Sequence, residues 1–476
     1  MEPMRFVIDE IRFYERDVVL RLPFRFGNAT VESCPQVYAR ARIRFADGSS
    51  SEGCSAEMMI PKWFDKNPAL TNEDNFTQLR TALTIARDAY TSDHESHTAW
   101  QHFARHYSAV LQAGRVAGLD ALVTSYGPAL IDRAVLDALC LHLGCSASAA
   151  LSANVPGVAP GGTGLADDLD EFSMDAFMAA QTHRGLAGRR IAARHTVGLA
   201  DALEARPEGA PQDGLPVTLV EVIERYGHRY FKLKLSGDPA ADVARLADIA
   251  GVIDRHAELV TLDGNEQYAD AGLIGEFLDR LDGASALAGF RRKIAFIEQP
   301  LPRALALDTD VSVIGARMPV LIDESDATID AFVQGRASGY TGVSSKSCKG
   351  VYKSILNAAR CVAWTHASGT TFFQSGEDLT MQAGVGVQQD LALVGWLGLT
   401  HVERNGHHYV NGMSALPPKE QAYFADDHAT LYEESAGATR LHIAHGDIDL
   451  SSLECRGFAT GVQGAHISWD AMRSAY

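Results

Sequence analysis

The sequence has no long apolar run, few cysteines and a deficit of positive charge. No stretch of about 20 apolar residues occurs, so we expect no transmembrane helix, and Met1 to Arg5 do not open a signal peptide. The seven cysteines are scattered without a CxxC pair, which favours reduced thiols over a disulfide framework. The net charge of −18 argues against nucleic acid or an anionic membrane as a partner. These absences together predict a cytoplasmic protein.

The composition is that of a soluble enzyme. A chain of 476 residues with 46% apolar content can bury a large core and predicts two domains. Residues 5–60 alternate as strands do, with a turn at Asp47-Gly48. Helical spacing follows over residues 71–120, and Gly127 predicts the start of another helix that ends at Leu143. Residues 153–168, rich in Gly, Pro and Ala, predict a loop or lid.

The most informative stretch is Phe-Lys-Leu-Lys-Leu at residues 231–235. It predicts a strand in which Lys232 and Lys234 share one face. Two ammonium groups about 5 Å apart repel by roughly 3 kcal/mol at an effective dielectric of about 20. That repulsion would lower one lysine pKa by roughly 2 units, toward the range of a general base. A solvated edge strand explains this stretch taken alone, but the segments downstream favour a closed barrel mouth.

Four further segments share one pattern, a short apolar run with a polar residue at its C-terminal end. They cover residues 258–265, 293–300, 319–325 and 342–349, and their polar residues are Asp263, Glu298, Asp323 and Lys346. These four residues are separated by 35, 25 and 23 positions, the length of one strand, one helix and two loops. A repeated βα unit is therefore predicted. In a parallel barrel the C-terminal strand ends converge on one mouth.

The three acids predict a metal site. Asp263, Glu298 and Asp323 would repel one another at one mouth without a cation between them. Oxygen ligands with no His or Cys among them favour Mg²⁺ over Zn²⁺. Each acid alone is better explained as a helix cap or a loop charge, so the prediction depends on all three in register with the lysines.

The ordered series Lys-x-Lys, Asp-x-Asn, Glu-Gln-Pro, Asp-Glu-Ser and Lys-x-x-Lys-Gly resembles the enolase superfamily, and within it the muconate-lactonising subgroup. The resemblance implies an α/β fold, a (β/α) barrel of the TIM type with an α+β N-terminal capping domain. It implies the capping domain at residues 1–125, the barrel with its metal site at 126–405, and a C-terminal segment that packs on the capping domain at 406–476. Barrel strands one, two, seven and eight are expected at residues 194–199, 230–235, 370–375 and 399–403.

The resemblance also implies removal of a proton α to a carboxylate, with Mg²⁺ stabilising the enolate. Lys234 and Lys346 would face opposite sides of the α-carbon, and Lys232 would tune Lys234. Glu324 or Lys349 could steady Lys346. The supporting residues expected at the site are Asn265, Glu324, Lys349 and Glu403. The expected partners are a small carboxylate substrate and further copies of the same chain.

Racemisation or epimerisation is the expected reaction, with cycloisomerisation or β-elimination by a dehydratase as the alternative. The His-Asp dyad of mandelate racemases is not apparent, since His366 precedes the seventh strand, and the Asp-x-Asp pair of dipeptide epimerases reads His-Val-Glu at residues 401–403. A metal-dependent hydrolase would need a His-x-His pair where His195 stands alone, and His407 and His408 are expected in a loop. A non-catalytic barrel would be expected to lack a ligand or a lysine, and none is missing.

Overall fold

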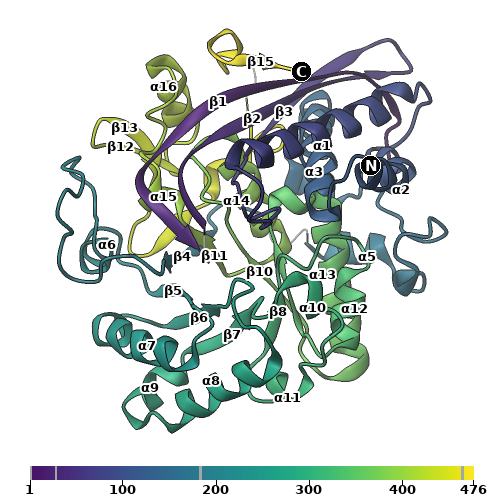
Figure 1. Ribbon diagram of the computed structural model, residues 1–476. Coiled ribbons are helices and arrows are strands. Elements are labelled where there is room, and N and C mark those ends of the chain that lie inside the picture. The colour runs from purple at the N-terminus through teal and green to yellow at the C-terminus, as the bar shows by residue number, and fades with distance from the viewer. Residues whose placement is uncertain (1–2, 27–28, 182–184, 462–465) are drawn as a thin grey trace.

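The computed structural model describes residues 3–26, 29–181, 185–461 and 466–476. An N-terminal layer of sheet and helices lies across one end of a barrel (Figure 1). The sheet of this layer has the antiparallel order β15-β1-β2-β3. Its strands are β1 (Phe6–Phe26), β2 (Ala29–Phe45), β3 (Ser50–Met58) and β15 (Arg473–Ala475).

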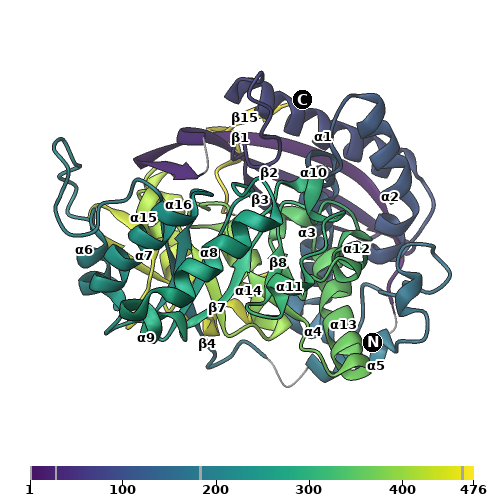
Figure 2. The same cartoon turned by 60° about the horizontal axis from the view of Figure 1, so that its bottom comes forward.

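Three long helices pack together beside this sheet (Figure 2), α1 (Asn72–Ser92), α2 (Ala99–Val116) and α3 (Ala121–Leu143). Thr71 and Thr98 open α1 and α2 with capping boxes, in which each hydroxyl accepts from a backbone N–H of the first turn. The C-terminal strand β15 returns to this layer, where Ala475 is opposite Phe13 of β1. The two ends of the chain therefore share one sheet.

Helix α3 begins at Ala121, six residues before Gly127. The predicted helix start at Gly127 is therefore wrong. Pro128 lies inside the helix, although proline has no N–H for the helical ladder. Gly127 is needed for packing, because a Cβ there would lie 2.4 Å from the carbonyl oxygen of Ala82 in α1. The Gly-Pro pair therefore marks a close helix crossing and not a helix terminus. The predicted boundary at residue 125 falls within this helix.

Eight parallel strands form the barrel, and pairing of the last with the first closes it. This arrangement confirms the predicted fold class. The strands are β4 (Arg190–Val197), β5 (Tyr230–Lys234), β6 (Leu259–Asp263), β7 (Ile294–Glu298), β8 (Val320–Ile322), β9 (Gly342–Ser345), β10 (Phe373–Gly376) and β11 (His401–Arg404).

Helices surround the barrel and continue beyond it (Figures 1 and 2). They are α4 (Ala147–Ser152), α5 (Met174–Ala180), α6 (Leu219–Tyr226), α7 (Pro239–Ile253), α8 (Ala271–Gly283), α9 (Ala288–Arg291), α10 (Arg303–Ala306), α11 (Ser312–Gly315), α12 (Ala331–Ala337), α13 (Val351–Ser368), α14 (Val385–Leu397), α15 (Gly406–Tyr409) and α16 (Pro418–Asp427). Three short strands follow, β12 (Tyr432–Ser435), β13 (Ala438–Leu441) and β14 (Asp447–Asp449). Within the described ranges no helix combines the length and the apolar character that crossing a membrane requires.

The first barrel strand lies earlier than predicted. Strand β4 begins at Arg190, four residues before the expected start, because β14 pairs antiparallel with its first half and places Asp447 opposite Ala192. That pairing joins segments more than 250 residues apart and leaves no local pattern. The seventh and eighth strands overlap the expected ranges and end one residue later, at Gly376 and Arg404.

Candidate active site

The strand register brings the predicted groups together at the barrel mouth. Lys234 is opposite Asp263 across β5 and β6, and Asp263 is opposite Glu298 across β6 and β7. Lys232 lies two residues before Lys234 and therefore on the same inward face. All four side chains are buried. The mouth thus places two lysines of one strand beside acids of the next two strands.

The Lys232 ammonium group lies at the centre of four carboxylates. Its Nζ is 2.9 Å from Asp263, 2.8 Å from Glu298, 2.8 Å from Glu377 and 3.0 Å from Glu403. Burial opposes its charge, but these carboxylates outweigh burial and raise the pKa of Lys232 well above its usual value. The surrounding acids therefore control the protonation of Lys232.

Lys234 and Lys346 lie on different carboxylates of the mouth. Lys234 Nζ is 2.5 Å from Asp263 Oδ2, and Lys346 Nζ is 2.6 Å from Asp323 Oδ2. Burial disfavours the charge of Lys346, yet Asp323 outweighs it and raises the pKa of this lysine. Lys349 Nζ lies 3.4 Å from Asp323 Oδ1, so it shares that carboxylate with Lys346. Each candidate base is thus paired with a predicted metal ligand.

Glu298 differs from the other two predicted ligands in its hydrogen bonding. Neither of its buried oxygens accepts a hydrogen bond from the described residues, and its ion pair is with the shared Lys232. Burial, and then the neighbouring carboxylates of Asp263 and Glu377, raise the pKa of Glu298 well above its usual value. A buried carboxylate with a raised pKa and no hydrogen bonds indicates missing positive charge, which a divalent cation that prefers oxygen ligands would supply.

Two residues with left-handed backbone hold the strand ends in place. Asn265 has φ 44° and Gln299 has φ 35°, a conformation that costs energy outside glycine and is frequent at functional sites. The Gln299 side-chain oxygen accepts hydrogen bonds from the backbone N–H groups of Asp323 and Ser325. This contact fixes the position of the Asp323 backbone relative to β7.

Glu324 takes part in this support in a different way from the one expected. Its Oε1 accepts a 2.7 Å hydrogen bond from Asn265 Nδ2 and lies 3.3 Å from Lys66 Nζ. It makes no such contact with Lys346, so the prediction that Glu324 steadies that lysine is wrong. Asn265 also donates its backbone N–H to Asp263 Oδ1, at 2.8 Å. Glu324 and Asn265 therefore orient Asp263.

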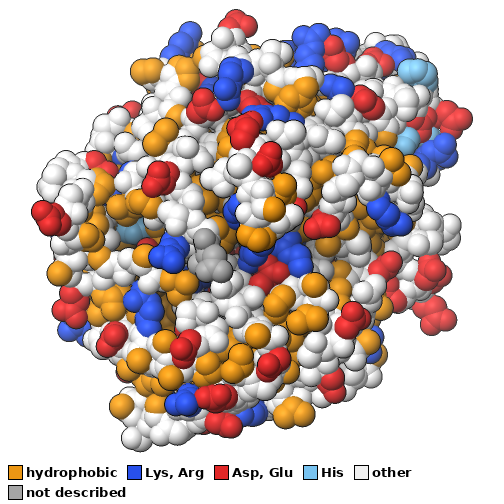
Figure 3. Space-filling view, in the orientation of Figure 1, with side chains coloured by type: hydrophobic (Ala, Val, Ile, Leu, Met, Phe, Trp, Pro, Cys, Tyr) orange, Lys and Arg blue, Asp and Glu red, His pale blue; other side chains and the backbone are white. Residues whose placement is uncertain are grey.

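A small cavity opens over these groups. Lys232, Lys234, Asn265, Lys346 and Glu403 line it from the barrel. The N-terminal layer contributes the apolar side chains Phe24, Phe26, Ile60 and Trp63. Basic and acidic side chains are visible in a recess at the middle of the face in Figure 3. The cavity therefore combines a charged floor with an apolar roof.

Trp63, in the apolar roof of the cavity, contacts Lys346 in its charged floor. Its ring lies 4.3 Å from Lys346 Nζ, within the range of a cation–π contact. Arg303, at the start of α10, donates from Nη2 to the carbonyl of Trp63 at 2.8 Å and from Nη1 to that of Phe64 at 2.6 Å. The same guanidinium pairs with Glu266 at 2.8 Å. This Arg303 clamp holds the Trp63 loop against the barrel.

Two site residues were not found from the sequence. Glu377 directly follows β10 and contacts Lys232, and Arg194 of β4 pairs with the same carboxylate. Glu377 lies at a strand end, as the three predicted ligands do, but the preceding residues Phe373–Gly376 are less apolar and weaken the pattern. Two hydrogen bonds hold Glu403 in place. Thr196 Oγ1 donates to it at 2.5 Å, and Asn405 Nδ2 donates to it at 3.0 Å.

Comparison with known proteins agrees with this geometry. Residues 217–412 match the family model described as enolase C-terminal domain-like. These residues belong to the enolase superfamily. The resemblance stated from the motifs is thereby confirmed. No curated protein matches the chain significantly.

Solved structures of the enolase superfamily share the fold along nearly the whole chain. A 2-chloromuconate cycloisomerase from Rhodococcus opacus 1CP is 16% identical, with a TM-score of 0.56 and coverage of 95% of this chain and 96% of that one. An enolase from Bradyrhizobium, complexed with magnesium and mandelic acid, is 15% identical, with a TM-score of 0.57 and 94% coverage of both chains. A muconate lactonizing enzyme from Pseudomonas fluorescens, complexed with muconolactone, is 18% identical, with a TM-score of 0.51 and coverage of 83% and 87%.

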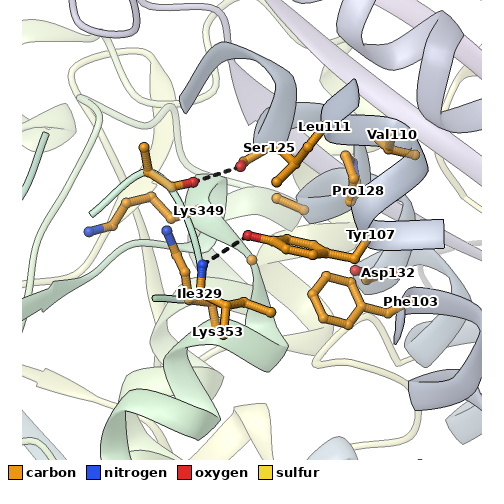
Figure 4. A pocket seen from close by; sticks show the side chains of 13 residues that line it. Phe103, Tyr107, Val110, Leu111, Ser125, Pro128, Asp132, Ile329, Lys349 and Lys353 are labelled. Atoms are coloured by element: carbon orange, nitrogen blue, oxygen red, sulfur yellow. Dashed lines mark hydrogen bonds between the residues drawn. The ribbon is translucent and has the colours of Figure 1, made fainter. Parts of the chain in front are cut away.

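A second small cavity lies between the N-terminal helices and the barrel (Figure 4). Phe103 and Tyr107 of α2 face it, and the side chains of Lys349 and Lys353 line its barrel side. Tyr107 accepts a 2.8 Å hydrogen bond from the backbone of Ile329, which ties α2 to the barrel. None of the three predicted metal ligands lines this cavity. Its wall adjoins the mouth at Lys349, which contacts Asp323.

Proposed function

We propose that this protein is a Mg²⁺-dependent enzyme that removes the proton α to a carboxylate and forms an enolate, and that it racemises or epimerises its substrate. The observation that carries the proposal is the placement of Lys234 and Lys346 on two carboxylates of one mouth, both lining one cavity. The enolase superfamily fold supports it, since members of this superfamily are isomerases and lyases.

Asp263, Glu298 and Asp323 would hold the Mg²⁺. When bound, the ion supplies positive charge that stabilises an enolate next to a carboxylate. The orphaned oxygens of Glu298 fit this role, because a buried carboxylate without hydrogen bonds needs a cation partner. Lys232 already supplies part of the required charge to Asp263 and Glu298.

The residues of the chain would move the proton. An α-carbon held between Lys234 and Lys346 would lose its proton to one amine and receive a proton from the other on the opposite face. The lysine that accepts the proton must first be neutral, whereas the lysine that donates must be protonated. Release of the accepting lysine from its carboxylate partner changes the balance that keeps it charged. Phe24 and Trp63 would exclude water from the reacting carbon.

Metal binding tests the first part of the proposal without knowledge of the substrate. Calorimetric titration of metal-free protein with Mg²⁺ should show one site, and Glu298→Gln should remove most of its affinity. Glu420→Gln is the matched control, because Glu420 is equally buried and paired with one arginine, Arg16, outside the mouth. Equal Mg²⁺ affinity in wild type and Glu298→Gln would contradict the assignment.

The reaction is tested by proton exchange in D₂O across amino acids, N-acyl amino acids, sugar acids and dipeptides. Racemisation predicts loss of the α-proton signal and formation of the other stereoisomer, both dependent on Mg²⁺. A product that has lost water, or has opened or closed a ring, would replace racemisation by elimination or cycloisomerisation. Exchange that persists in EDTA would contradict the metal-dependent mechanism.

A further inference from the structure

Three buried histidines meet outside the barrel wall. His195 lies in the middle of β4, His228 just before β5, and His407 in α15 after β11. Their Nδ1 or Nε2 atoms all lie within 4.8 Å of one another. His407 Nε2 is 3.3 Å from His195 Nδ1 and 3.2 Å from His228 Nε2. His407, expected in a loop, lies in the short helix α15.

This histidine cluster is separate from the barrel mouth. The neighbours of His195 in β4, Arg194 and Thr196, contact interior groups of the barrel, so His195 points to the opposite face of the strand. On that face Tyr226 lies edge-on to His407, with ring centroids 5.0 Å apart. The cluster is therefore enclosed by α6, α15 and the outer side of the barrel.

The ring hydrogens of three neutral histidines cannot satisfy both nitrogen–nitrogen contacts of this cluster. His228 Nδ1 lies 3.0 Å from the carbonyl oxygen of Ala193, which can only accept, so Nδ1 carries the hydrogen and Nε2 presents a lone pair. That lone pair faces His407 Nε2, which in turn faces His195 Nδ1. A single hydrogen on His407 Nε2 would have to be shared between two acceptors. A hydrogen on His195 Nδ1 instead would leave two lone pairs facing each other.

The three rings are in the state that metal ligation requires. Burial lowers the pKa of His228 to about 4 and that of His195 and His407 well below the usual value, so all three are neutral near pH 7. The hydrogen bond from His228 to Ala193 fixes ring orientation, as partners of metal-bound histidines do. Tetrahedral zinc with Zn–N bonds of about 2.0–2.1 Å places its nitrogens about 3.3 Å apart. The two contacts of His407 match that spacing, and the third pair of nitrogens lies within 4.8 Å.

We propose that His195, His228 and His407 bind one divalent transition-metal ion of the Zn²⁺ type, at a structural site distinct from the carboxylate site. Imidazole nitrogen prefers such ions, whereas Mg²⁺ prefers oxygen. The positive charge of Arg404, near His407, is compensated by its ion pairs with Asp378 and Asp390. The cluster therefore presents lone pairs to a cation without an unpaired positive charge beside it.

The position of the site explains what such an ion would do. Strand β4 pairs with β11 on one side and β5 on the other, where the barrel closes. The ion would join a residue in β4, one before β5 and one after β11. On the interior side of the same seam Thr196 holds Glu403, one of the carboxylates around Lys232. An ion at the histidine cluster would thus fix the closing seam and, through it, the back of the active site.

Zinc retention in excess Mg²⁺ tests the proposal, since Mg²⁺ blocks the carboxylate site and leaves imidazole sites free. A competing surface group, Asp93, Glu95 and His97, requires a His97→Gln background. In that background the full-length protein should retain one Zn²⁺ per chain after dialysis. His401→Gln is the matched control, a largely buried histidine outside the cluster, and should also retain one. No retained zinc in the His97→Gln protein would overturn the proposal.

Variants and a direct measurement locate the ion. His228→Gln and His407→Gln should each weaken Zn²⁺ binding by at least about 100-fold, more than loss of a supporting residue does. They should also lose the visible absorption of tetrahedral Co²⁺. Glu298→Gln should retain zinc, so failure of the magnesium proposal is distinguishable. If either histidine variant misfolds, anomalous diffraction at the zinc edge still decides. A peak between the three rings supports the site, whereas a peak elsewhere or none contradicts it.

Discussion

Lys232 and Glu298 form a buried ion pair, with Nζ 2.8 Å from Oε2, in which the carboxylate has no other cation among the described residues and the ammonium has three other carboxylates. Lys232 therefore occupies the position beside Glu298 where an added positive charge would be most favourable. A divalent ion bound by Glu298 would compete with Lys232 for the same oxygens. The two cations should consequently show negative coupling.

Replacing Lys232 by Met tests this coupling. Without Mg²⁺ the variant should lose about 3–5 kcal/mol of stability, because several buried carboxylates are left without their shared partner. Added Mg²⁺ should restore much of this loss, and calorimetry should show tighter Mg²⁺ binding than in wild type. Lys293→Met is the control, since Lys293 forms a partly exposed pair with Asp254. Weaker Mg²⁺ binding in Lys232→Met would show that the lysine assists the metal.

Lys234 and Lys346 should be separable by stereochemistry. Lys234→Ala and Lys346→Ala should each reduce net turnover by about 100-fold or more, the usual contribution of a positioned acid or base. Each remaining lysine should still exchange the α-proton on its own face. NMR in D₂O should therefore show exchange with one enantiomer for one variant and with the other enantiomer for the second. Exchange of the same enantiomer by both variants would refute the two-base assignment, provided that Mg²⁺ affinity is intact.

Gly53 should be essential for packing of α3 on the N-terminal sheet. A Cβ at Gly53 would lie 2.2 Å from the backbone nitrogen of Ala138. Gly53→Ala should destabilise the protein by about 2 kcal/mol or more, because two backbone segments must move apart. Gly251→Ala, at an open position in α7, should leave stability unchanged or raise it by up to about 1 kcal/mol. Similar melting temperatures for the two variants would contradict the contact.

His102 should make stability depend on pH in the acid range. Burial lowers the pKa of His102 to about 4, and its ring Nε2 lies 2.9 Å from the carbonyl oxygen of Phe6. Because the unfolded chain binds the proton near pH 6.5, the free energy of unfolding should fall between pH 6.5 and 4, by about 3 kcal/mol from this group. Chemical denaturation across this range should show a shallower fall in His102→Gln. An unchanged slope would exclude His102 as the cause.

The active-site carboxylates were predictable because each lies at the C-terminal end of a short apolar strand. Asp263, Glu298 and Asp323 stand where a buried run gives way to a polar residue, and the strand period places the two lysines on one face. The local sequence contains that information. Glu377 follows the same rule after a strand with weaker apolar character, so the pattern was present but faint.

Groups that meet through tertiary contacts were not predictable. His195 and His407 are separated by 212 positions, and nothing in either neighbourhood indicates the other. The early start of β4 depends on β14 in the same way. Glu377, one of the four carboxylates around Lys232, was missed because it follows strand seven, whose end the sequence defines poorly.

The Arg303 clamp has a consequence for protein engineering. Arg303 donates hydrogen bonds to the backbone carbonyls of Trp63 and Phe64, so substitution of the Trp63 or Phe64 side chain leaves these bonds in place. An insertion or deletion in the loop would instead move the carbonyls away from Arg303. Libraries that seek new substrate preference should therefore keep the length of this loop fixed. Diversity is better placed at Phe24 and Phe26, which line the same cavity from a strand of another part of the layer.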